Sequence, residues 1–173
     1  PIPSRGLGDV YKRQQLHFLK EEITRTNLII KKLYNTKINF KNLEIVDSIE
    51  EAVKNADLIQ ENVPERLTLK KDVIKNISKY SPSNSIIASS SSGLLPSDLQ
   101  SKCINPKRLI IAHPFNPVYI LPLVEIVKGK KTTNLYLNKA KKFYQKIKMK
   151  TLLVEKELPG FLSDRLQEAL WRE

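Results

Sequence analysis

The sequence predicts an α/β fold in which helices pack on a parallel β-sheet of crossover units. Short apolar runs alternate with longer amphipathic segments through most of the chain, which is the pattern of consecutive βαβ units. Proline, glycine and small polar residues separate these segments. Polar side chains follow three of the apolar runs, at the carboxyl ends where parallel sheets bind their ligands.

Apolar periodicity and local capping signals define each element. The apolar runs predict strands at residues 43–46, 57–63, 85–89, 108–112, 121–127 and 151–154. Amphipathic stretches predict helices at residues 15–35, 48–56, 64–80, 96–103, 132–149 and from about 161 to 173. Ser48 and Glu51 form a capping box for the second helix, and Pro64 is expected in the first turn of the third. Thr132 to Asn134 are expected to cap the fifth helix.

Residues 1–14 differ in composition from the rest of the chain. They hold two of the five glycines and two of the ten prolines, without an amphipathic period. This segment resembles translated adapter or vector sequence, so we leave it out of the fold prediction. Gly6 and Gly8 resemble the start of a phosphate-binding turn, but Tyr11 occupies the third glycine position and no strand precedes the motif.

The composition limits the classes of partner. The net charge of +12, from 30 Lys and Arg against 18 Asp and Glu, would permit nucleic-acid binding. The lysines are scattered and no basic stripe with interleaved aromatic residues occurs, so no nucleic-acid partner is expected. Cys103 is the single cysteine, which excludes an intramolecular disulfide and a cysteine zinc cluster, and no metal is expected. No apolar run is long enough to span a membrane, and a cytoplasmic protein is expected.

His113 and Glu125 form the pair with the clearest chemical promise. His113 ends one apolar run, and Glu125 lies in the next, after a connection that three prolines make rigid. We therefore expect the two residues side by side on neighbouring strands. A carboxylate beside an imidazole fixes its tautomer and stabilises its charged form, as a general base requires. From spacing alone, an incidental histidine and glutamate in a polar loop is an equally open interpretation.

The position of three polar clusters favours the functional interpretation. Residues 61–65, 89–93 and 113–116 each follow a predicted strand at its carboxyl end. In a parallel sheet these ends lie on one edge, so the three clusters are expected to converge on one site.

Four segments carry a family resemblance: ADLIQENVPERLTLKK, IIASSSSGLLPSDL, AHPFNPVYILPLVEIV and LPGFLSDRLQEALWRE. In this order they resemble the 3-hydroxyacyl-CoA dehydrogenase superfamily over roughly residues 40–173. Within it, HPFNPVYILPLVE and DRLQEALWRE are most similar to the carnitine dehydrogenases. The resemblance implies an N-terminal Rossmann domain that binds NAD, followed by an all-helical domain that forms a homodimer.

The resemblance also implies a domain division. Residues 15–158 would form an incomplete Rossmann domain that lacks the first βαβ unit, and residues 159–173 would begin a truncated helical domain. The chain would thus be an internal fragment. By itself it is expected to be inactive and to bind NAD too weakly to measure.

Motif positions imply roles for individual residues. His113 matches the catalytic base of the superfamily and Glu125 its partner carboxylate. Ser92 matches the serine that binds substrate beside the nicotinamide, and Asn116 matches an asparagine that contacts the cofactor. Ser92 as a turn or cap residue and Asn116 as a turn former remain open alternatives.

Three further residues have weaker matches. Glu65 and Lys70 match two cofactor contacts, although a solvated helix face is an open alternative. Asp164 departs from the asparagine of acyl-CoA enzymes and agrees with the carnitine dehydrogenases, which makes it a candidate on the substrate side. A surface pair with Arg165 is its alternative.

The implied activity is NAD-dependent oxidation of the 3-hydroxyl of L-carnitine to 3-dehydrocarnitine, a small-molecule substrate. An aromatic-lined pocket is expected for the trimethylammonium group. The alternatives are a 3-hydroxyacyl-CoA or L-gulonate 3-dehydrogenase, or a non-catalytic, crystallin-like structural protein. The presence of His113, Glu125 and Ser92 together argues against the structural protein.

Overall fold

A computed structural model describes residues 4–36, 39 and 41–173. The chain divides into two compact units, residues 1–44 and 45–173, which are described separately. Within the described residues, no helix combines the length and the apolar character needed to cross a bilayer.

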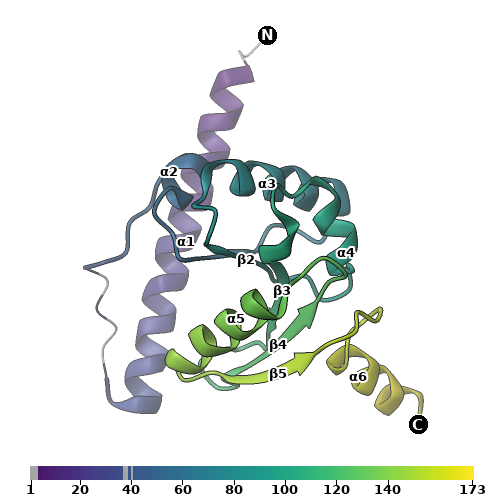
Figure 1. Cartoon of the computed structure of the whole chain (residues 1–173). Coiled ribbons are helices and arrows are strands. Elements are labelled where there is room, and N and C mark those ends of the chain that lie inside the picture. Colours follow the sequence, from purple (N-terminus) through teal and green to yellow (C-terminus); the bar gives the residue numbers. More distant parts are fainter. Residues whose placement is uncertain (1–3, 37–38, 40) are drawn as a thin grey trace. The chain divides into compact units, whose positions relative to one another are not determined.

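The first unit contains one long helix, α1 (Ser4–Tyr34) (Figure 1). The predicted helix at residues 15–35 is therefore present, but it begins well upstream of its expected start. Residues 4–14, which we left out of the fold prediction, are part of it, while residues 1–3 lie outside the described residues. The printed sequence has no proline between Ser4 and Tyr34, so no proline interrupts a helix that begins upstream of residue 15.

The second unit is built on a five-stranded sheet with the order β1-β2-β3-β4-β5 (Figure 1). Its strands are β1 (Leu58–Glu61), β2 (Ile86–Ser89), β3 (Leu109–Pro114), β4 (Leu123–Lys128) and β5 (Lys150–Val154). Strands β1, β2 and β3 are parallel, β4 runs antiparallel to β3, and β5 is parallel to β4. The α/β class is confirmed, but the sheet is mixed because the short Pro-rich connection returns β4 beside β3 in the opposite direction.

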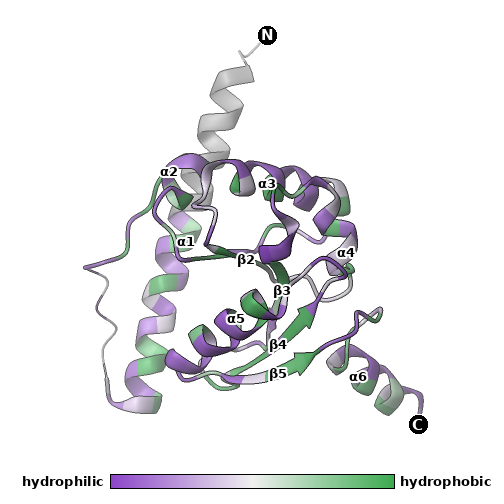
Figure 2. Ribbon diagram, in the orientation of Figure 1, coloured by the Kyte–Doolittle hydropathy of each residue, from purple (hydrophilic) through white to green (hydrophobic). Residues whose placement is uncertain are grey.

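Helices cover both faces of the sheet. The helices of this unit are α2 (Ile49–Val53), α3 (Leu67–Tyr80), α4 (Pro96–Leu99), α5 (Asn134–Lys146) and α6 (Ser163–Arg172), with short 3-10 turns at Gln100–Lys102 and Pro106–Arg108. Along β3, Leu109 and Ile111 pack in the core that includes Ile74 of α3, while Ile110 and Ala112 pack in the core that includes Leu137 of α5. All four β3 residues are fully buried, and the strands carry the most hydrophobic stretches of the ribbon (Figure 2).

Two predictions are wrong: the strand at residues 43–46 and the start of the third helix at Pro64. Residues 43–46 form no strand, and Leu43 and Ile45 are exposed. A strand needs a partner, and β1 is the outermost strand of the described sheet with no further strand beside it. Pro64 is not in the first turn of α3, which begins at Leu67, because the preceding residues are held outside the helix. In particular, the Glu61 carboxylate accepts from the Val63 N–H at 2.6 Å.

Smaller differences concern helix ends. Ser48 is the N-cap of α2, as predicted, with its hydroxyl accepting from the Glu51 N–H at 3.1 Å, but α2 ends at Val53. Helix α5 ends at Lys146, and Lys148 has a left-handed φ of 67°, which cannot continue a helix. The Thr132 hydroxyl does not cap α5, because it donates to the Leu109 carbonyl at 2.6 Å.

Candidate active site

His113 and Glu125 face each other directly across β3 and β4. The Nδ1 atom of His113 lies 3.7 Å from Oε2 of Glu125, an ion-pair distance that is longer than a hydrogen bond. Nδ1 is buried and has no hydrogen-bond partner within the described residues. The expected proximity of the two side chains is therefore observed, at a distance longer than the predicted hydrogen bond.

Glu125 is fully buried at the centre of a small hydrogen-bond network. Its Oε1 accepts from the Leu162 N–H at 2.7 Å, and its Oε2 accepts from the Ser163 hydroxyl at 2.8 Å. Burial by itself would raise the pKa of the Glu125 carboxyl. The His113 ring, the Leu162 N–H and the Ser163 hydroxyl together outweigh burial and lower that pKa below its ordinary value. Glu125 is therefore held as a carboxylate, the form that stabilises an imidazolium.

An open cleft of about 630 Å³ lies beside this pair. Its wall is made by residues from the end of β3 and from α6, including His113, Phe115, Asn116, Ser163, Asp164 and Leu166. The side chain of His113 is 18% exposed, so the ring is reachable while Nδ1 points to the buried carboxylate. The rings of Phe115 and Phe161 lie 5.6 and 6.4 Å from the imidazole centroid and provide an apolar surrounding.

The structure brings some of the remaining predicted residues to this cleft. Asn116 and Asp164 line it together with His113. Ser92 follows β2 by three residues, and His113 lies near the end of the adjacent parallel strand, so both occupy the carboxyl edge of the sheet. Ser92 is half-buried in the loop after β2.

Lys70 lies in a second polar cluster at the same edge, beyond β1 and β2. Its side chain is 1% exposed, and Nζ donates to Oε1 of Glu61 at 3.0 Å and to the Val63 carbonyl at 2.9 Å. Glu61 also accepts from the Ser89 hydroxyl at 2.5 Å. The donors of Lys70 are thus used inside the protein, which favours a scaffold role over the cofactor contact that the family motif implies.

Glu65 binds the loop that contains Ser92. Its Oε1 accepts from the Ser91 hydroxyl, from the Gly93 N–H at 3.2 Å and from the Leu94 N–H at 3.4 Å. Burial would raise the pKa of the Glu65 carboxyl, but these donors and the nearby Lys70 lower it. The three bonds fix the backbone on both sides of Ser92. The solvated-helix alternative does not describe Glu65, because its carboxylate is bound to this loop.

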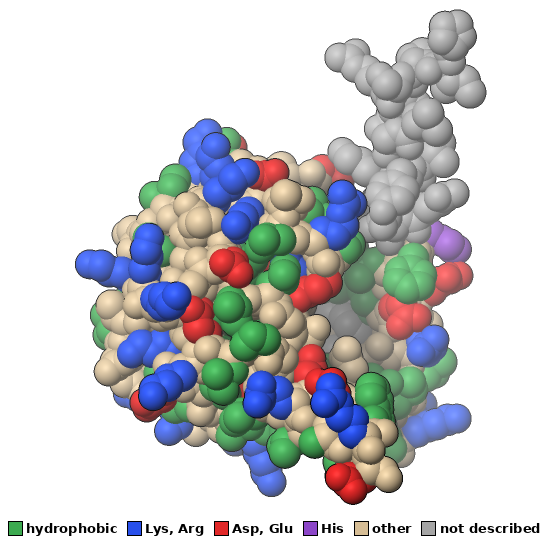
Figure 3. Space-filling view, turned by 90° about the vertical axis from the view of Figure 1, so that its right-hand side faces the viewer, with side chains coloured by type: hydrophobic (Ala, Val, Ile, Leu, Met, Phe, Trp, Pro, Cys, Tyr) green, Lys and Arg blue, Asp and Glu red, His purple; other side chains and the backbone are tan. Residues whose placement is uncertain are grey.

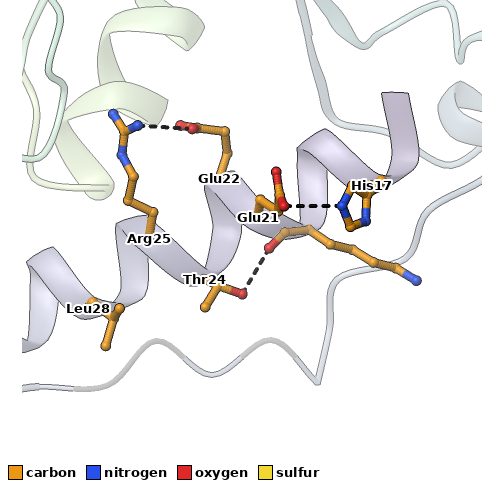
Figure 4. A pocket seen from close by; sticks show the side chains of 7 residues that line it. His17, Glu21, Glu22, Thr24, Arg25 and Leu28 are labelled. Atoms are coloured by element: carbon orange, nitrogen blue, oxygen red, sulfur yellow. Dashed lines mark hydrogen bonds and ion pairs between the residues drawn. The ribbon is translucent and has the colours of Figure 1, made fainter. Parts of the chain in front are cut away.

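A hollow on α1 is lined by His17, Glu21, Glu22, Arg25 and their neighbours. His17 and Glu21 are paired at 3.1 Å, and Arg25 and Glu22 at 3.3 Å, along one exposed helix face (Figure 4). Such pairs support a helix by a few tenths of a kcal/mol, roughly. Among the residues that the structure describes, no group of three His, Cys, Asp or Glu could hold a metal ion.

Basic side chains do not gather into a stripe on the face shown in Figure 3. There the Lys and Arg side chains are dispersed among acidic and apolar ones. This distribution agrees with the scattered lysines of the sequence.

Comparison with known proteins identifies the family. The model of the 3-hydroxyacyl-CoA dehydrogenase NAD-binding domain matches residues 11–158. The chain belongs to this family. It is 59% identical over 131 residues to L-carnitine dehydrogenase of Oceanobacillus iheyensis, covering 76% of this chain and 43% of that protein. It is 53% identical over 131 residues to L-carnitine dehydrogenase of Pseudomonas syringae, covering 76% of this chain and 41% of that protein. The chain thus spans less than half the length of these relatives.

Solved structures agree with the assignment. A 5-formyl-3-hydroxy-2-methylpyridine 4-carboxylic acid 5-dehydrogenase, an NAD⁺-dependent dismutase, is 35% identical with a TM-score of 0.71, covering 74% of this chain and 41% of that chain. A diketoreductase is 26% identical with a TM-score of 0.84, covering 91% of this chain and 58% of that chain. The α/β fold with a Rossmann-type NAD-binding arrangement is therefore confirmed.

The residues present fit one end of the cofactor that the family implies. Ser92, His113 and Asn116 lie at or beyond the carboxyl ends of β2 and β3, the edge at which such sheets bind a dinucleotide. They would face the nicotinamide. The printed sequence contains no G-x-G-x-x-G turn, so it offers no matching cradle for the pyrophosphate.

The sequence pattern predicted only some of the residues of the site. It did not predict the Leu162 N–H and the Ser163 hydroxyl, which donate to Glu125 across 37 and 38 residues of chain. The pairing of Lys70 with the buried Glu61 was also not predicted. The position of Glu61 directly after an apolar run was a sequence signal for this pairing. A carboxylate that is buried at such a position requires a cation or several hydrogen-bond donors.

Proposed function

We propose that the protein containing this chain oxidises the 3-hydroxyl group of L-carnitine to 3-dehydrocarnitine with NAD as cofactor. The observation that carries the proposal is the His113–Glu125 pair, in which Glu125 is buried and His113 lines the 630 Å³ cleft. Relatives named L-carnitine dehydrogenase, 51–59% identical, support the choice of substrate.

His113 is the proposed general base. Its Nδ1 faces Glu125, which leaves Nε2 as the nitrogen that accepts the proton of the substrate hydroxyl. Glu125 stays ionised and stabilises the imidazolium that forms, so the proton remains on His113 until it returns to solvent. Ser92 donates to the substrate oxygen and aligns it. NAD would supply the acceptor for the hydride that leaves the carbinol carbon.

Asp164 is the proposed contact for the positive end of carnitine. It lies on the cleft wall made by the first turn of α6, in the same cleft as His113 and Phe115. A carboxylate attracts a fixed trimethylammonium group, and an aromatic face adds about 0.5–2 kcal/mol. The carboxylate in place of asparagine at this position therefore favours a cationic substrate over an acyl-CoA.

The proposal extends to the arrangement of the whole protein. Residues 15–158 would be the NAD-binding part and residues 159–173 the start of a helical domain, with the family match extending upstream to residue 11. The helical domain would form a homodimer, and the protein would act in the cytoplasm.

The test is NADH formation, followed by absorbance, in the intact protein that contains this sequence. L-carnitine is expected to be turned over, with acetoacetyl-CoA reduction and L-gulonate oxidation at least tenfold slower. Preference for a CoA thioester or for gulonate would contradict the substrate, and no turnover of any of the three would contradict the activity.

A matched variant tests the assigned contact. Asp164→Asn is expected to raise KM for L-carnitine about tenfold, one ionic contact of roughly 1.4 kcal/mol. Activity with 3-hydroxybutyrate, which lacks the ammonium, should change little. An equal loss with both substrates would show that Asp164 does not bind the cation.

A further inference from the structure

The carboxylate of Glu125 accepts hydrogen bonds from two donors, and the His113 ring lies near one of its oxygens. Oε2 accepts from the Ser163 hydroxyl at 2.8 Å and lies 3.7 Å from Nδ1 of His113. Oε1 is held separately by the Leu162 N–H at 2.7 Å. Ser163 and His113 therefore approach the same oxygen, but only the serine forms a hydrogen bond with it.

The Ser163 hydroxyl does not serve its own helix. Ser163 is the first residue of α6, whose N-cap is Leu162 and which has no side-chain hydrogen bond at its cap. Ser163 and Leu162 both line the cleft, and Asp164 follows directly. The first turn of α6 is thus fastened to the carboxylate of β4, and the hydroxyl is used for this contact instead of a capping bond.

We propose that Ser163 is a positioning residue that sets the basicity of His113 by holding Oε2 of Glu125. A donated hydroxyl disperses negative charge on Oε2 and fixes its place, so that the carboxylate attracts the His113 proton less strongly. This inference deepens the proposed function and rests on it for the role of His113.

The direction of the effect follows from the charges that face His113. Among the described residues, Glu125 of β4 is the ionisable side chain paired with the ring, and Asp164 lines the same cleft from α6. Phe115 and Phe161, whose rings lie near the imidazole, carry no charge. Without the Ser163 hydroxyl, Oε2 has one donor fewer and is free to approach Nδ1. A closer and less neutralised carboxylate favours the protonated imidazole, which raises the pH at which the base becomes available.

The first measurement is the pH profile of kcat/KM for L-carnitine. Ser163→Ala is expected to move the acid limb to higher pH by roughly 0.5–1 unit, the scale of one charge-assisted hydrogen bond. Ser163→Thr keeps the hydroxyl and should restore the wild-type limb. An unmoved limb in Ser163→Ala, or a Thr limb that follows the Ala one, would overturn the inference.

The second measurement does not depend on turnover. Nuclear magnetic resonance of the His113 ring in the intact protein, assigned by the signal lost in His113→Asn, gives the titration midpoint directly. The same upward shift is expected in Ser163→Ala, and an unchanged midpoint would overturn the role of Ser163. If the protein fails to oxidise carnitine while the midpoint still shifts, the proposed function fails and the inference on Ser163 stands. Ser163→Cys, with nearly the same volume and a weak donor, replaces the Ala variant if that one does not fold.

Discussion

Two polar clusters occupy the carboxyl edge of one sheet and differ in how completely they are bonded. Beyond β1 and β2, Lys70 is 1% exposed, and it forms hydrogen bonds of 2.9–3.2 Å to Glu61 and the Val63 carbonyl. At the end of β3, His113 is 18% exposed, and its Nδ1 lies 3.7 Å from Glu125 without a hydrogen bond within the described residues. A cluster whose polar groups are all hydrogen-bonded holds the backbone in place. An imidazole that has no hydrogen-bond partner at Nδ1 and is partly exposed to a cleft can accept and release a proton.

The difference assigns two kinds of role to residues that look alike in sequence. Lys70 and Glu61 behave as a buried ion pair, in which removing one partner is costly because the other charge remains unpaired. Glu125 accepts hydrogen bonds from the Leu162 N–H and the Ser163 hydroxyl, so its carboxylate keeps both donors when the histidine is replaced. Substitutions in the first cluster should change stability, and those in the second should change turnover.

The largest expected effect is on turnover at His113. In the intact protein, His113→Ala should lower kcat for L-carnitine by about 10²–10⁴-fold, the usual contribution of a positioned base, with little change in unfolding. The matched control is His17→Ala, since the side chain of His17 is 77% exposed on α1. Steady-state kinetics measure both. Wild-type turnover in His113→Ala would remove the histidine from the mechanism.

The complementary effect on stability is expected at Lys70. Lys70→Met leaves the Glu61 carboxylate buried without its cation and should lower the free energy of unfolding by about 3–5 kcal/mol. Urea unfolding measures it. Lys102→Met, which breaks the surface pair with Asp72 at 2.5 Å, should have no resolvable effect. Equal effects of the two substitutions would contradict the scaffold role of the buried pair.

A smaller effect on turnover is expected at Glu125. Glu125→Gln keeps a side chain of the same shape but removes the charge that stabilises the imidazolium. The expected loss in kcat is about tenfold, which corresponds to about 1.4 kcal/mol of lost transition-state stabilisation. The same kinetics, run beside His113→Ala, rank the two losses. A Gln variant as impaired as the Ala variant would mean that the carboxylate does more than stabilise the ring.

The smallest effect is expected at Glu65, as a dependence of stability on pH. The pKa of this carboxyl is lowered from its ordinary value of 4.5, so its contribution is complete above that pH and is lost as the pH falls through the lower, folded-state pKa. Because the side chain is 41% exposed, solvent screening keeps the contribution below about 1 kcal/mol. Glu65→Gln should therefore flatten the acid side of the stability curve slightly, as thermal unfolding between pH 3 and 7 would show. An unchanged acid side would argue against the role of Glu65 at the Ser92 loop.

Local pattern was enough to predict most of the fold and the core of the site. The strands beginning at Leu58, Ile86, Leu109, Leu123 and Lys150 were all predicted to within a few residues, because apolar runs bounded by turn residues are a property of near neighbours. The proximity of His113 and Glu125 followed in the same way, from two runs joined by a short, rigid connection. A slip of one residue would have placed them on opposite faces, and the observed register places them directly opposite each other.

Only the tertiary structure decided which polar groups meet. Residues 43–46 have a strand-like pattern but form no strand, because pairing depends on a neighbouring strand and not on the segment itself. Lys70 is a solvated residue by local pattern and a buried one in the fold. Ser163 donates to Glu125 across 38 residues of chain, because the start of α6 lies beside the buried carboxylate of β4. A buried carboxylate requires hydrogen-bond donors. Packing determines which hydrogen-bond partners meet when they are far apart in sequence. The periodicity of apolar residues along the chain does not predict these partners.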